Sequence, residues 1–413
     1  MDKLWDVVVI GGGPAGMMAA GRAAERGRQV LLLEKNPSLG KKLLISGGGR
    51  CNFTNNKPDV RVMLAQYGDA GKFLFSAFSQ WGVAETIDFF RERGMAVKEE
   101  AEGRMFPASD RSESVFEVLD RYVKDGRVLI REHTEVTGVS RDVETGHFVV
   151  RFRNDTMIMA KACVLATGGL SHPETGSTGE GLVWLRELGH TIDDTDASLV
   201  PLSLRDPWVR KLSGVTLPDI KLTVYLGETR KFSRPGKILF THVGVSGPTV
   251  LNMSKAVGML LAEGEVRILI DLFPHFDHGA LKDELQTKLT TESNKLLRNT
   301  LSKMVPATLA SILLELAGID AETVNRTVTR EMRTTIVSLM KAVPLHVKGL
   351  LGEDKAIVSS GGVSLAEVNW KTMESRVVPH LYLVGDVLDI DRPSGGYSLQ
   401  LCWTTGFVAG EHC

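Results

Sequence analysis

The most regular hydrophobic pattern lies at the start of the chain, where the apolar run Val7 to Ile10 passes directly into the glycine-rich segment Gly11 to Gly16. A second apolar run, Val30 to Leu33, ends at the acidic residue Glu34. Unbroken apolar runs are typical of strands buried on both faces, and we expect a helix that begins near Ala15 to join them. The order of strand, glycines, helix, strand and acid predicts a βαβ unit that binds a dinucleotide.

Helical spacing of apolar positions follows this unit and predicts helices over residues 72–81, 83–93 and 112–124. Residues 147–161 then alternate around a central Asn-Asp pair, which predicts a β-hairpin. The apolar segment Ala162 to Ala166 is expected to form a separate strand.

The middle of the chain has a different pattern. Residues 198–271 offer short alternating segments separated by Gly and Pro, which predicts an antiparallel sheet or a small barrel. Helical spacing dominates in residues 281–316 and 322–341, and the α/β pattern returns at residues 356–358, 361–363 and 381–384. We therefore predict an α/β chain whose domains are a discontinuous Rossmann-like domain, residues 1–193 and 345–413, an inserted β-barrel-like domain, residues 194–272, and a helical subdomain, residues 273–344.

Composition narrows the possible partners. The 49 Lys and Arg against 50 Asp and Glu give a net charge of −1, so we expect no nucleic-acid partner. Four distant cysteines without a C-x-x-C pair disfavour a disulfide framework and indicate a reducing compartment. With no leader pattern and no stretch apolar enough for a membrane, the expected location is the cytoplasm. The pattern predicts no metal site and leaves the oligomeric state open.

Each residue of the fingerprint has a physical task. Gly11 permits a tight turn, Gly13 lets backbone N–H groups approach a pyrophosphate, and Gly16 lets the helix pack closely on the strands. The phosphates are expected at the positive end of the helix. The Glu34 carboxylate is placed to accept both hydroxyls of an adenosine ribose.

A second glycine-rich segment, Gly40 to Asn52, contains three consecutive glycines and the cations Lys41, Lys42 and Arg50. These cations match a pyrophosphate, so we interpret the segment as backbone held close to a ligand. A flexible surface loop is the alternative interpretation.

Distant signals favour FAD over NAD. The pair Gly385-Asp386 ends a late strand, where its carboxylate is expected to accept a hydrogen bond from a ribitol hydroxyl. The segment Gly395 to Gln400 opens a predicted helix, whose N-terminus would stabilise negative charge on the flavin pyrimidine by about 0.3 to 2 kcal/mol.

These residues resemble bacterial FAD-dependent oxidoreductases of the aminoacetone oxidase type. The resemblance covers nearly the whole chain and implies a Rossmann-like FAD domain interrupted by a barrel-like domain and a small helical one. The sequence departs from the family pattern at Glu180 and Ser398. The motifs that carry the resemblance are Gly40 to Asn55, Gly103 to Pro107, Thr175 to Gly181, Phe240 to Pro248 and Gly395 to Gln400.

The resemblance implies a set of FAD contacts along the chain, with the backbone of Val136 against the adenine. The implied cofactor-binding residues, together with the Gly385 of the Gly-Asp pair, are Gly11, Gly13, Ala15, Gly16, Glu34, Lys35, Lys42, Arg50, Asn52, Val136, Thr167, Gly168, Gly385, Asp386, Gly396 and Leu399.

The expected chemistry is transfer of a hydride between flavin N5 and a small organic substrate, with one proton to manage. His242 is the candidate proton carrier, and Arg104 the candidate anchor for a carboxylate or carbonyl. The alternatives are a structural His242 and an Arg104 that pairs with Glu100 or Glu102.

Three functional hypotheses stay open. The first is a reductase or dehydrogenase that acts on a C=C or C–C bond with NAD(P)H as candidate electron donor, although the chain has no second complete G-x-G-x-x-G. The second, implied by the resemblance, is an amine oxidase that forms peroxide. The third is an FAD-containing accessory or RNA-modification protein, which the near-neutral charge disfavours.

Overall fold

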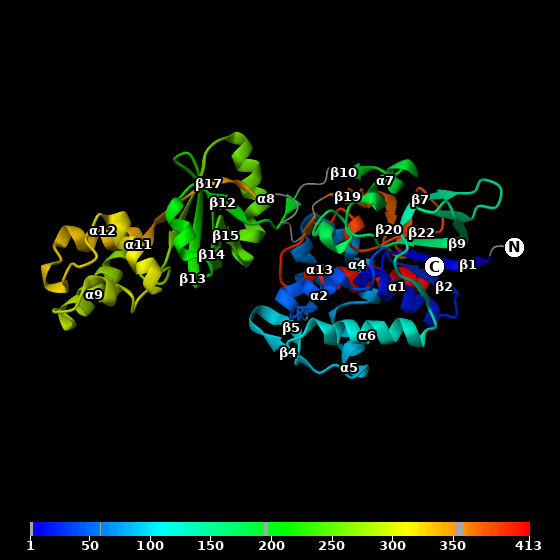
Figure 1. Cartoon of the computed structure of the whole chain (residues 1–413), viewed down its shortest axis with the longest axis horizontal. Coiled ribbons are helices and arrows are strands. Elements are labelled where there is room, and N and C mark those ends of the chain that lie inside the picture. Colours follow the sequence, from blue (N-terminus) through cyan, green and yellow to red (C-terminus); the bar gives the residue numbers. More distant parts are fainter. Residues whose placement is uncertain (1–2, 58, 194–196, 352–357, 360) are drawn as a thin grey trace. The chain divides into compact units, whose positions relative to one another are not determined.

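A computed structural model describes residues 3–57, 59–193, 197–351, 358–359 and 361–413. The chain forms two compact units (Figure 1). The first unit combines Met1–Ser198 with Glu353–Cys413, and the second unit is Leu199–Gly352. The chain therefore leaves the first unit once and returns to it, as expected for an inserted region.

A parallel sheet forms the centre of the first unit. The N-terminal apolar runs lie in its middle, where Val7, Val9 and Leu32 are fully buried. Its five parallel strands, in spatial order, are β22 (Leu381–Leu383), β9 (Met157–Leu165), β1 (Leu4–Ile10), β2 (Val30–Leu33) and β6 (Leu129–Arg131). Antiparallel additions to this sheet are β20 (Val368–Asn369), β21 (Glu374–Ser375), β7 (Val136–Arg141) and β8 (Phe148–Phe152). The Rossmann-like α/β prediction is confirmed.

Strand β9 differs from the prediction of two separate strands. It runs without a break from Met157 to Leu165 and pairs in parallel with β1 along its length. Its first half also pairs with β8, and there Met157 and Lys161 are exposed, whereas Val164 and Leu165 are fully buried. The sequence pattern changes within one strand because only its second half is covered on both faces.

The predicted helices of the first unit form close to their expected bounds. Short strands complete this unit as a three-stranded sheet and two small pairs. The helices are α1 (Pro14–Glu25), α2 (Lys41–Ile45), α3 (Val60–Leu64), α4 (Gly71–Gln80), α5 (Val83–Glu92), α6 (Ser112–Asp125), α7 (Glu180–Glu187) and α13 (Tyr397–His412). The strands are β3 (Thr54–Asn55), β4 (Val97–Glu100), β5 (Arg104–Pro107), β10 (Ile192–Asp193), β11 (Ala197–Ser198), β18 (Val358–Ser359) and β19 (Gly362–Val363).

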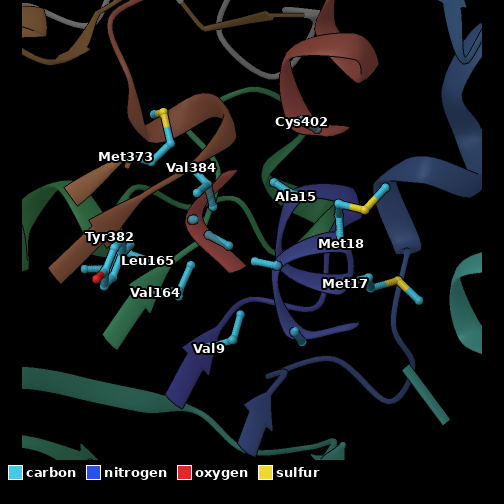
Figure 2. Packing of buried hydrophobic residues seen from close by; sticks show 14 of the residues in the cluster. Val9, Ala15, Met17, Met18, Val164, Leu165, Met373, Tyr382, Val384 and Cys402 are labelled. Carbon is cyan, nitrogen blue, oxygen red and sulfur yellow. The ribbon is translucent and has the colours of Figure 1, made fainter. Parts of the chain in front are cut away.

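Helix α13 packs tightly against α1, beside the parallel strands. A Cβ atom added at Gly406 would lie 2.5 Å from the Ala15 oxygen, and one at Gly410 would lie 2.5 Å from the Ala19 oxygen. Figure 2 shows Ala15 of α1 and Cys402 of α13 among the buried side chains of this core. Glycine on one face thus brings the last helix of the chain against the first.

The second unit contains a closed six-stranded barrel. Because β17 pairs with both β16 and β12, it closes the barrel, so residues 345–350 belong to the barrel. The predicted boundary at residue 345 differs from this arrangement, and the predicted boundary at 194 lies outside the described residues. The barrel order is β12 (Leu202–Leu204), β15 (Gly244–Ser246), β14 (Thr229–Phe240), β13 (Thr216–Leu226), β16 (Val266–Asp271) and β17 (Val343–Leu350).

The helical region of the second unit shares one hydrophobic core with the barrel. Leu285, Leu313 and Ile336 of the helices belong to the same buried cluster as Ile268 and Leu345 of the strands. None of the helices in the described ranges is both long and apolar enough to cross a membrane. The helices of this unit are α8 (Pro248–Glu263), α9 (His278–Thr291), α10 (Leu297–Leu301), α11 (Ala307–Ala317) and α12 (Arg330–Lys341).

Candidate functional site

A cavity of about 400 Å³ lies in the first unit, at the carboxyl ends of the parallel strands β1, β2, β9 and β22. This edge of a parallel sheet is where doubly wound folds bind ligands. The walls come from the β1–α1 turn, the end of β2, the glycine-rich segment after α2, the loop after β9 and the start of α13. Segments distant in sequence therefore meet at one cavity.

The fingerprint glycines take three different geometries. Gly11 has φ +107°, which favours glycine, and Gly16 approaches so closely that a Cβ there would overlap the Gly11 oxygen. Gly13 is different, because no protein atom lies within 4 Å of the position of an added Cβ. Gly13 also caps α1, whose first turn has no side-chain cap. Gly13 and Ala15 also line the cavity, so the uncapped start of α1 is available to an anion there.

Glu34 is buried at the end of β2, and the backbone holds its carboxylate in place. Its Oε2 accepts a hydrogen bond from Gly12 N at 2.8 Å, and Oε1 accepts one from Asn36 N at 2.7 Å. The neighbouring Lys35 also lines the cavity, where its Nζ donates to Glu180 Oε1 and Thr178 Oγ1, both at 2.7 Å. Asn36 Nδ2 also donates to Glu34 Oε1, at 2.8 Å, so Oε2 is the oxygen that keeps a lone pair for a ribose hydroxyl.

Lys42 lines the cavity, and its Nζ donates to the Ser171 carbonyl oxygen at 2.6 Å. Burial lowers the pKa of Lys42, and the nearby Asp386 carboxylate opposes this shift. A phosphate placed in the cavity would favour the charged form of Lys42, which makes this residue a suitable partner for a pyrophosphate.

Arg50 lies apart from the cavity, unlike Lys42. Its guanidinium pairs with Glu100 and Asp110 and lies 4.3 Å from the centroid of the Phe106 ring. These carboxylates raise the pKa of Arg50. The sequence interpretation of Arg50 as a pyrophosphate donor ignored these two acids, which the fold of β4 and the start of α6 brings to it.

Asp386 also lines the cavity and pairs with the buried Arg392. Arg392 Nε also donates to Ser398 Oγ at 3.0 Å, and its Nη1 donates to the Ile390 oxygen at 2.6 Å. Arg392 therefore ties Asp386 to the start of α13. Sequence reasoning missed Arg392, because a single Arg in a loop has no periodic signal.

The cavity passes two tests of fit for an elongated dinucleotide. Thr167 lines it, and the buried Thr167 Oγ1 has no hydrogen-bond partner among the described residues, so a ligand can satisfy it. Gly13 and Gly48 also line it, and each leaves open the space that a side chain would fill. The residues present therefore fit FAD, with the adenosine end at Glu34 and the flavin end near Asp386.

Most of the predicted cofactor residues meet at this cavity. Gly16, Arg50, Asn52 and Gly396 do not line it; Gly16 and Gly396 instead allow close backbone packing, at Gly11 and Thr54. The predicted residues that line the cavity are Gly11, Gly13, Ala15, Glu34, Lys35, Lys42, Val136, Thr167, Gly168, Gly385, Asp386 and Leu399. Lining residues that sequence reasoning missed include Thr134, Ser177 and Trp184.

The two predicted catalytic residues belong to different units. Arg104 opens β5 opposite Asn55, whose Nδ2 donates to the Gly395 oxygen at 3.0 Å, beside the start of α13. Its Nε donates to the Ala101 oxygen at 3.0 Å and lies 3.8 Å from Glu102 Oε2, an ion pair that agrees with the alternative interpretation, while its Nη atoms have no partner among the described residues. His242 is exposed in the turn between β14 and β15 of the second unit. Both roles stay predictions.

The four cysteines are buried and form no disulfide. Cys51 has φ 58° in the glycine-rich segment, and burial raises the pKa of its thiol to about 12. Burial also raises the pKa of Cys402, which lines the cavity, to about 12. Such thiols stay protonated at neutral pH, which disfavours a thiol relay for electrons.

Comparisons with known proteins agree over nearly the full chain. Residues 5–412 match the family described as HI0933-like protein Rossmann domain. The chain is 32% identical to the ribosomal RNA dihydrouridine synthase of Escherichia coli (strain K12), over 98% of this chain and 97% of the relative. It is 31% identical to the 3-dehydro-bile acid delta(4,6)-reductase of Clostridium scindens, with the same two coverages.

The fold is also shared with solved structures. The 3-ketosteroid delta1-dehydrogenase from Sterolibacterium denitrificans gives a TM-score of 0.56 at 13% identity and covers 99% of both chains. The 3-ketosteroid-delta4-(5alpha)-dehydrogenase from Rhodococcus jostii RHA1 gives 0.54 at 15% identity, over 100% of this chain and 97% of the other. At these identities the likeness concerns the fold.

Proposed function

Since the chain belongs to the HI0933-like Rossmann family of FAD-dependent oxidoreductases, we propose that it reduces a carbon–carbon double bond conjugated to a carbonyl group. The observation that carries this proposal is the chemistry common to the two near-full-length relatives. A dihydrouridine differs from uridine by two hydrogens across a double bond conjugated to a carbonyl. A delta(4,6)-reductase of a 3-dehydro steroid acts on double bonds conjugated to a ketone.

In this proposal the first unit holds FAD along the cavity. Glu34 binds the adenosine ribose, and the N-terminus of α1 with Lys42 binds the pyrophosphate. Asp386, oriented by Arg392, accepts a hydrogen bond from the ribityl chain, and Leu399 lies at the flavin end. Bound FAD supplies hydride transfer through flavin N5.

The substrate carbonyl needs a cation or hydrogen-bond donor, because negative charge develops on its oxygen when hydride adds to the β-carbon. Arg104 is our candidate for this role, since its Nη atoms are free of partners in the described structure. The α-carbon then needs a proton, for which His242 stays the candidate. Turnover of Arg104→Ala and His242→Ala proteins that retain FAD tests both roles; unchanged turnover in both contradicts them.

We propose NAD(P)H as the electron donor. Over one turnover, a hydride from NAD(P)H and a proton from solvent add across the double bond, and NAD(P)⁺ is released. Without a second complete G-x-G-x-x-G fingerprint, the nicotinamide would reach the flavin without a Rossmann domain of its own.

Anaerobic mixing of the yellow protein with NADH or NADPH tests the donor and the class of reaction. The proposal predicts that the flavin absorbance bleaches and that 2-cyclohexenone restores it with formation of cyclohexanone. An aminoacetone oxidase would instead bleach with the amine alone and form peroxide in air, an outcome that contradicts the proposal.

Two substrate classes fit this chemistry: a small enone and the uracil ring of an RNA. The uracil ring is a candidate because the chain is 32% identical to an enzyme named for ribosomal RNA. The flavin responses of the same protein to a small enone and to a uridine-containing RNA separate the two classes.

A further inference from the structure

The near-neutral charge of the whole chain conceals two units of opposite charge. Residues 199–352 carry 20 Lys and Arg against 14 Asp and Glu, a net charge of +6. The remaining residues carry 29 against 36, a net charge of −7. The net charge of −1, from which the sequence predicts no nucleic-acid partner, is the sum of these two values.

The basic residues of the second unit concentrate on its longest pair of strands, β13 and β14. We call their five cations the basic hairpin: Lys221, Arg230, Lys231, Arg234 and Lys237. The four on β14 are exposed, and Lys221 is half-buried. Within the described ranges, none of the five forms an ion pair with a carboxylate. Their charge is therefore available to a partner.

The two acids of these strands do not neutralise the basic hairpin. Asp219 Oδ2 lies 3.0 Å from His275 Nε2, and Glu228 Oε2 lies 3.3 Å from Arg267 Nη2. Elsewhere in the same unit, cations are commonly paired; Lys211 with Glu315 and Arg298 with Glu322 are examples. Other cations of this unit, such as Lys282 and Arg330, also lack a carboxylate partner in the described residues, but β13 and β14 carry five unpaired cations on two neighbouring strands.

Aromatic rings and hydroxyls lie among these cations. Arg234 lies 5.5 Å from the centroid of the Phe232 ring, and Arg267 lies 5.7 Å from that of Tyr225. Arg230 Nη2 donates to Ser233 Oγ at 2.9 Å. Cations bind phosphates, while half-buried rings and guanidinium planes offer stacking surfaces to unpaired bases. An acidic protein would need only the cations.

We propose that the basic hairpin of the second unit docks the phosphate backbone of a single-stranded RNA segment. This inference rests on the proposed function in one respect: it takes uracil within the docked RNA as the substrate whose double bond is reduced. The docking itself depends on charge and stacking, so it can be measured without turnover.

The test measures binding of a fluorescent single-stranded oligouridylate to the FAD-loaded protein over a range of salt concentrations. Replacing Arg230, Lys231 and Arg234 together by Gln should weaken binding at least tenfold near physiological salt. Each lost phosphate contact reduces the slope of log affinity against log salt by about 0.7, so the triple variant should lose about 2.

A matched control removes three other cations of the second unit: Lys282, Arg326 and Arg330, each replaced by Gln. These lack carboxylate partners in the described residues, and the change in net charge is the same. The control should retain the affinity and salt slope of the parent. The double variant Arg230→Lys and Arg234→Lys should retain most binding, and flavin absorbance checks that all variants are folded.

Equal RNA affinity in the parent and the triple variant would overturn the proposal, as would an equal loss in the control. Competition by polyglutamate as strong as by RNA, charge for charge, would also overturn it, since that marks a general anion surface. The enone assay separates the two ideas: RNA docking without reduction of any conjugated double bond contradicts the proposed function alone.

Discussion

Single glycines determine whether the cavity can accept a dinucleotide. Gly11 and Gly16 are restricted by the protein itself, through a positive φ and through close backbone packing. Gly13 has an ordinary φ of −76° and open space on its Cβ side. Only a ligand would meet a side chain at Gly13, which separates its binding role from a structural one.

We predict that Gly13→Ala lowers FAD affinity at least tenfold, while the free energy of unfolding of the FAD-free protein changes by less than about 0.5 kcal/mol. Fluorescence titration with FAD and denaturant unfolding measure the two quantities. Gly138→Ala, on β7 with no atom within 4 Å of the added Cβ, is the control and should retain FAD affinity. Retained affinity in Gly13→Ala would place the pyrophosphate elsewhere.

Arg392 is the second residue whose role can be isolated. Arg392→Met leaves the carboxylate of Asp386 without its buried partner, so we expect a loss of about 3 kcal/mol in the free energy of unfolding and weaker FAD binding. Arg153→Met breaks an exposed pair with Glu135 and should cost measurably less. If FAD restores Arg392→Met to the stability of the parent, the positioning role is wrong.

Lys42 makes the FAD-free protein sensitive to pH. Its pKa is lowered by burial, so between that pKa and the ordinary 10.5 the unfolded chain binds more protons than the folded one. The free energy of unfolding should therefore rise with pH in this window. Lys42→Met should remove that rise, which pH-dependent urea unfolding measures; an unchanged rise contradicts the assignment.

At the level of elements, the contact between α1 and α13 brings the start of the last helix to the fingerprint turn, and both segments line the cavity. Gly406 and Gly410 let the two helices approach, so the segment that begins at Tyr397 reaches the fingerprint. The flavin half of the site therefore depends on correct docking of the last helix.

Gly410→Ala should lower the free energy of unfolding by about 1 to 2 kcal/mol, because overpacking against the Ala19 oxygen exceeds the helix-propensity gain of Ala. Gly279→Ala, exposed in the first turn of α9, should be neutral or stabilising by up to about 1 kcal/mol. Thermal and urea unfolding of both variants compare them. Equal free energies of unfolding in the two variants would contradict the close packing of α13 against α1.

Sequence patterns predicted where helices and strands lie better than which strands pair with one another. Unbroken apolar runs identified β1 and β2, and glycine before Tyr397 identified the start of α13. The change of pattern inside β9 hid its continuity, because burial changes along the strand. The predicted boundary at residue 345 divides strand β17, because a change of sequence pattern does not show which strands a segment pairs with.

The same limit applies to the site. The fingerprint predicted the roles of Gly11 to Glu34, because the residues of this βαβ unit that bind a dinucleotide lie close together in the sequence. The partners of Arg50 come from other segments, and Arg392 reaches Asp386 across a loop without a periodic pattern, so these ion pairs appear only in three dimensions. Residue type alone could not decide whether a cation faces a phosphate or a carboxylate.

At the scale of the whole molecule, the chain divides its tasks between two units. The first, with a net charge of −7, contains the dinucleotide cavity; the second, with +6, contains the basic hairpin. Salt should therefore weaken the binding of an RNA much more than the binding of a small neutral enone.

The reduction of a conjugated double bond can be followed as one anaerobic turnover of the FAD-loaded protein. We would reduce it with one equivalent of NAD(P)H, after which 2-cyclohexenone or a uridine-containing RNA is added. The prediction is recovery of the oxidised flavin absorbance and one equivalent of product with both hydrogens added across the double bond. Flavin that stays reduced with both acceptors, and is reoxidised only by oxygen with release of peroxide, would contradict it.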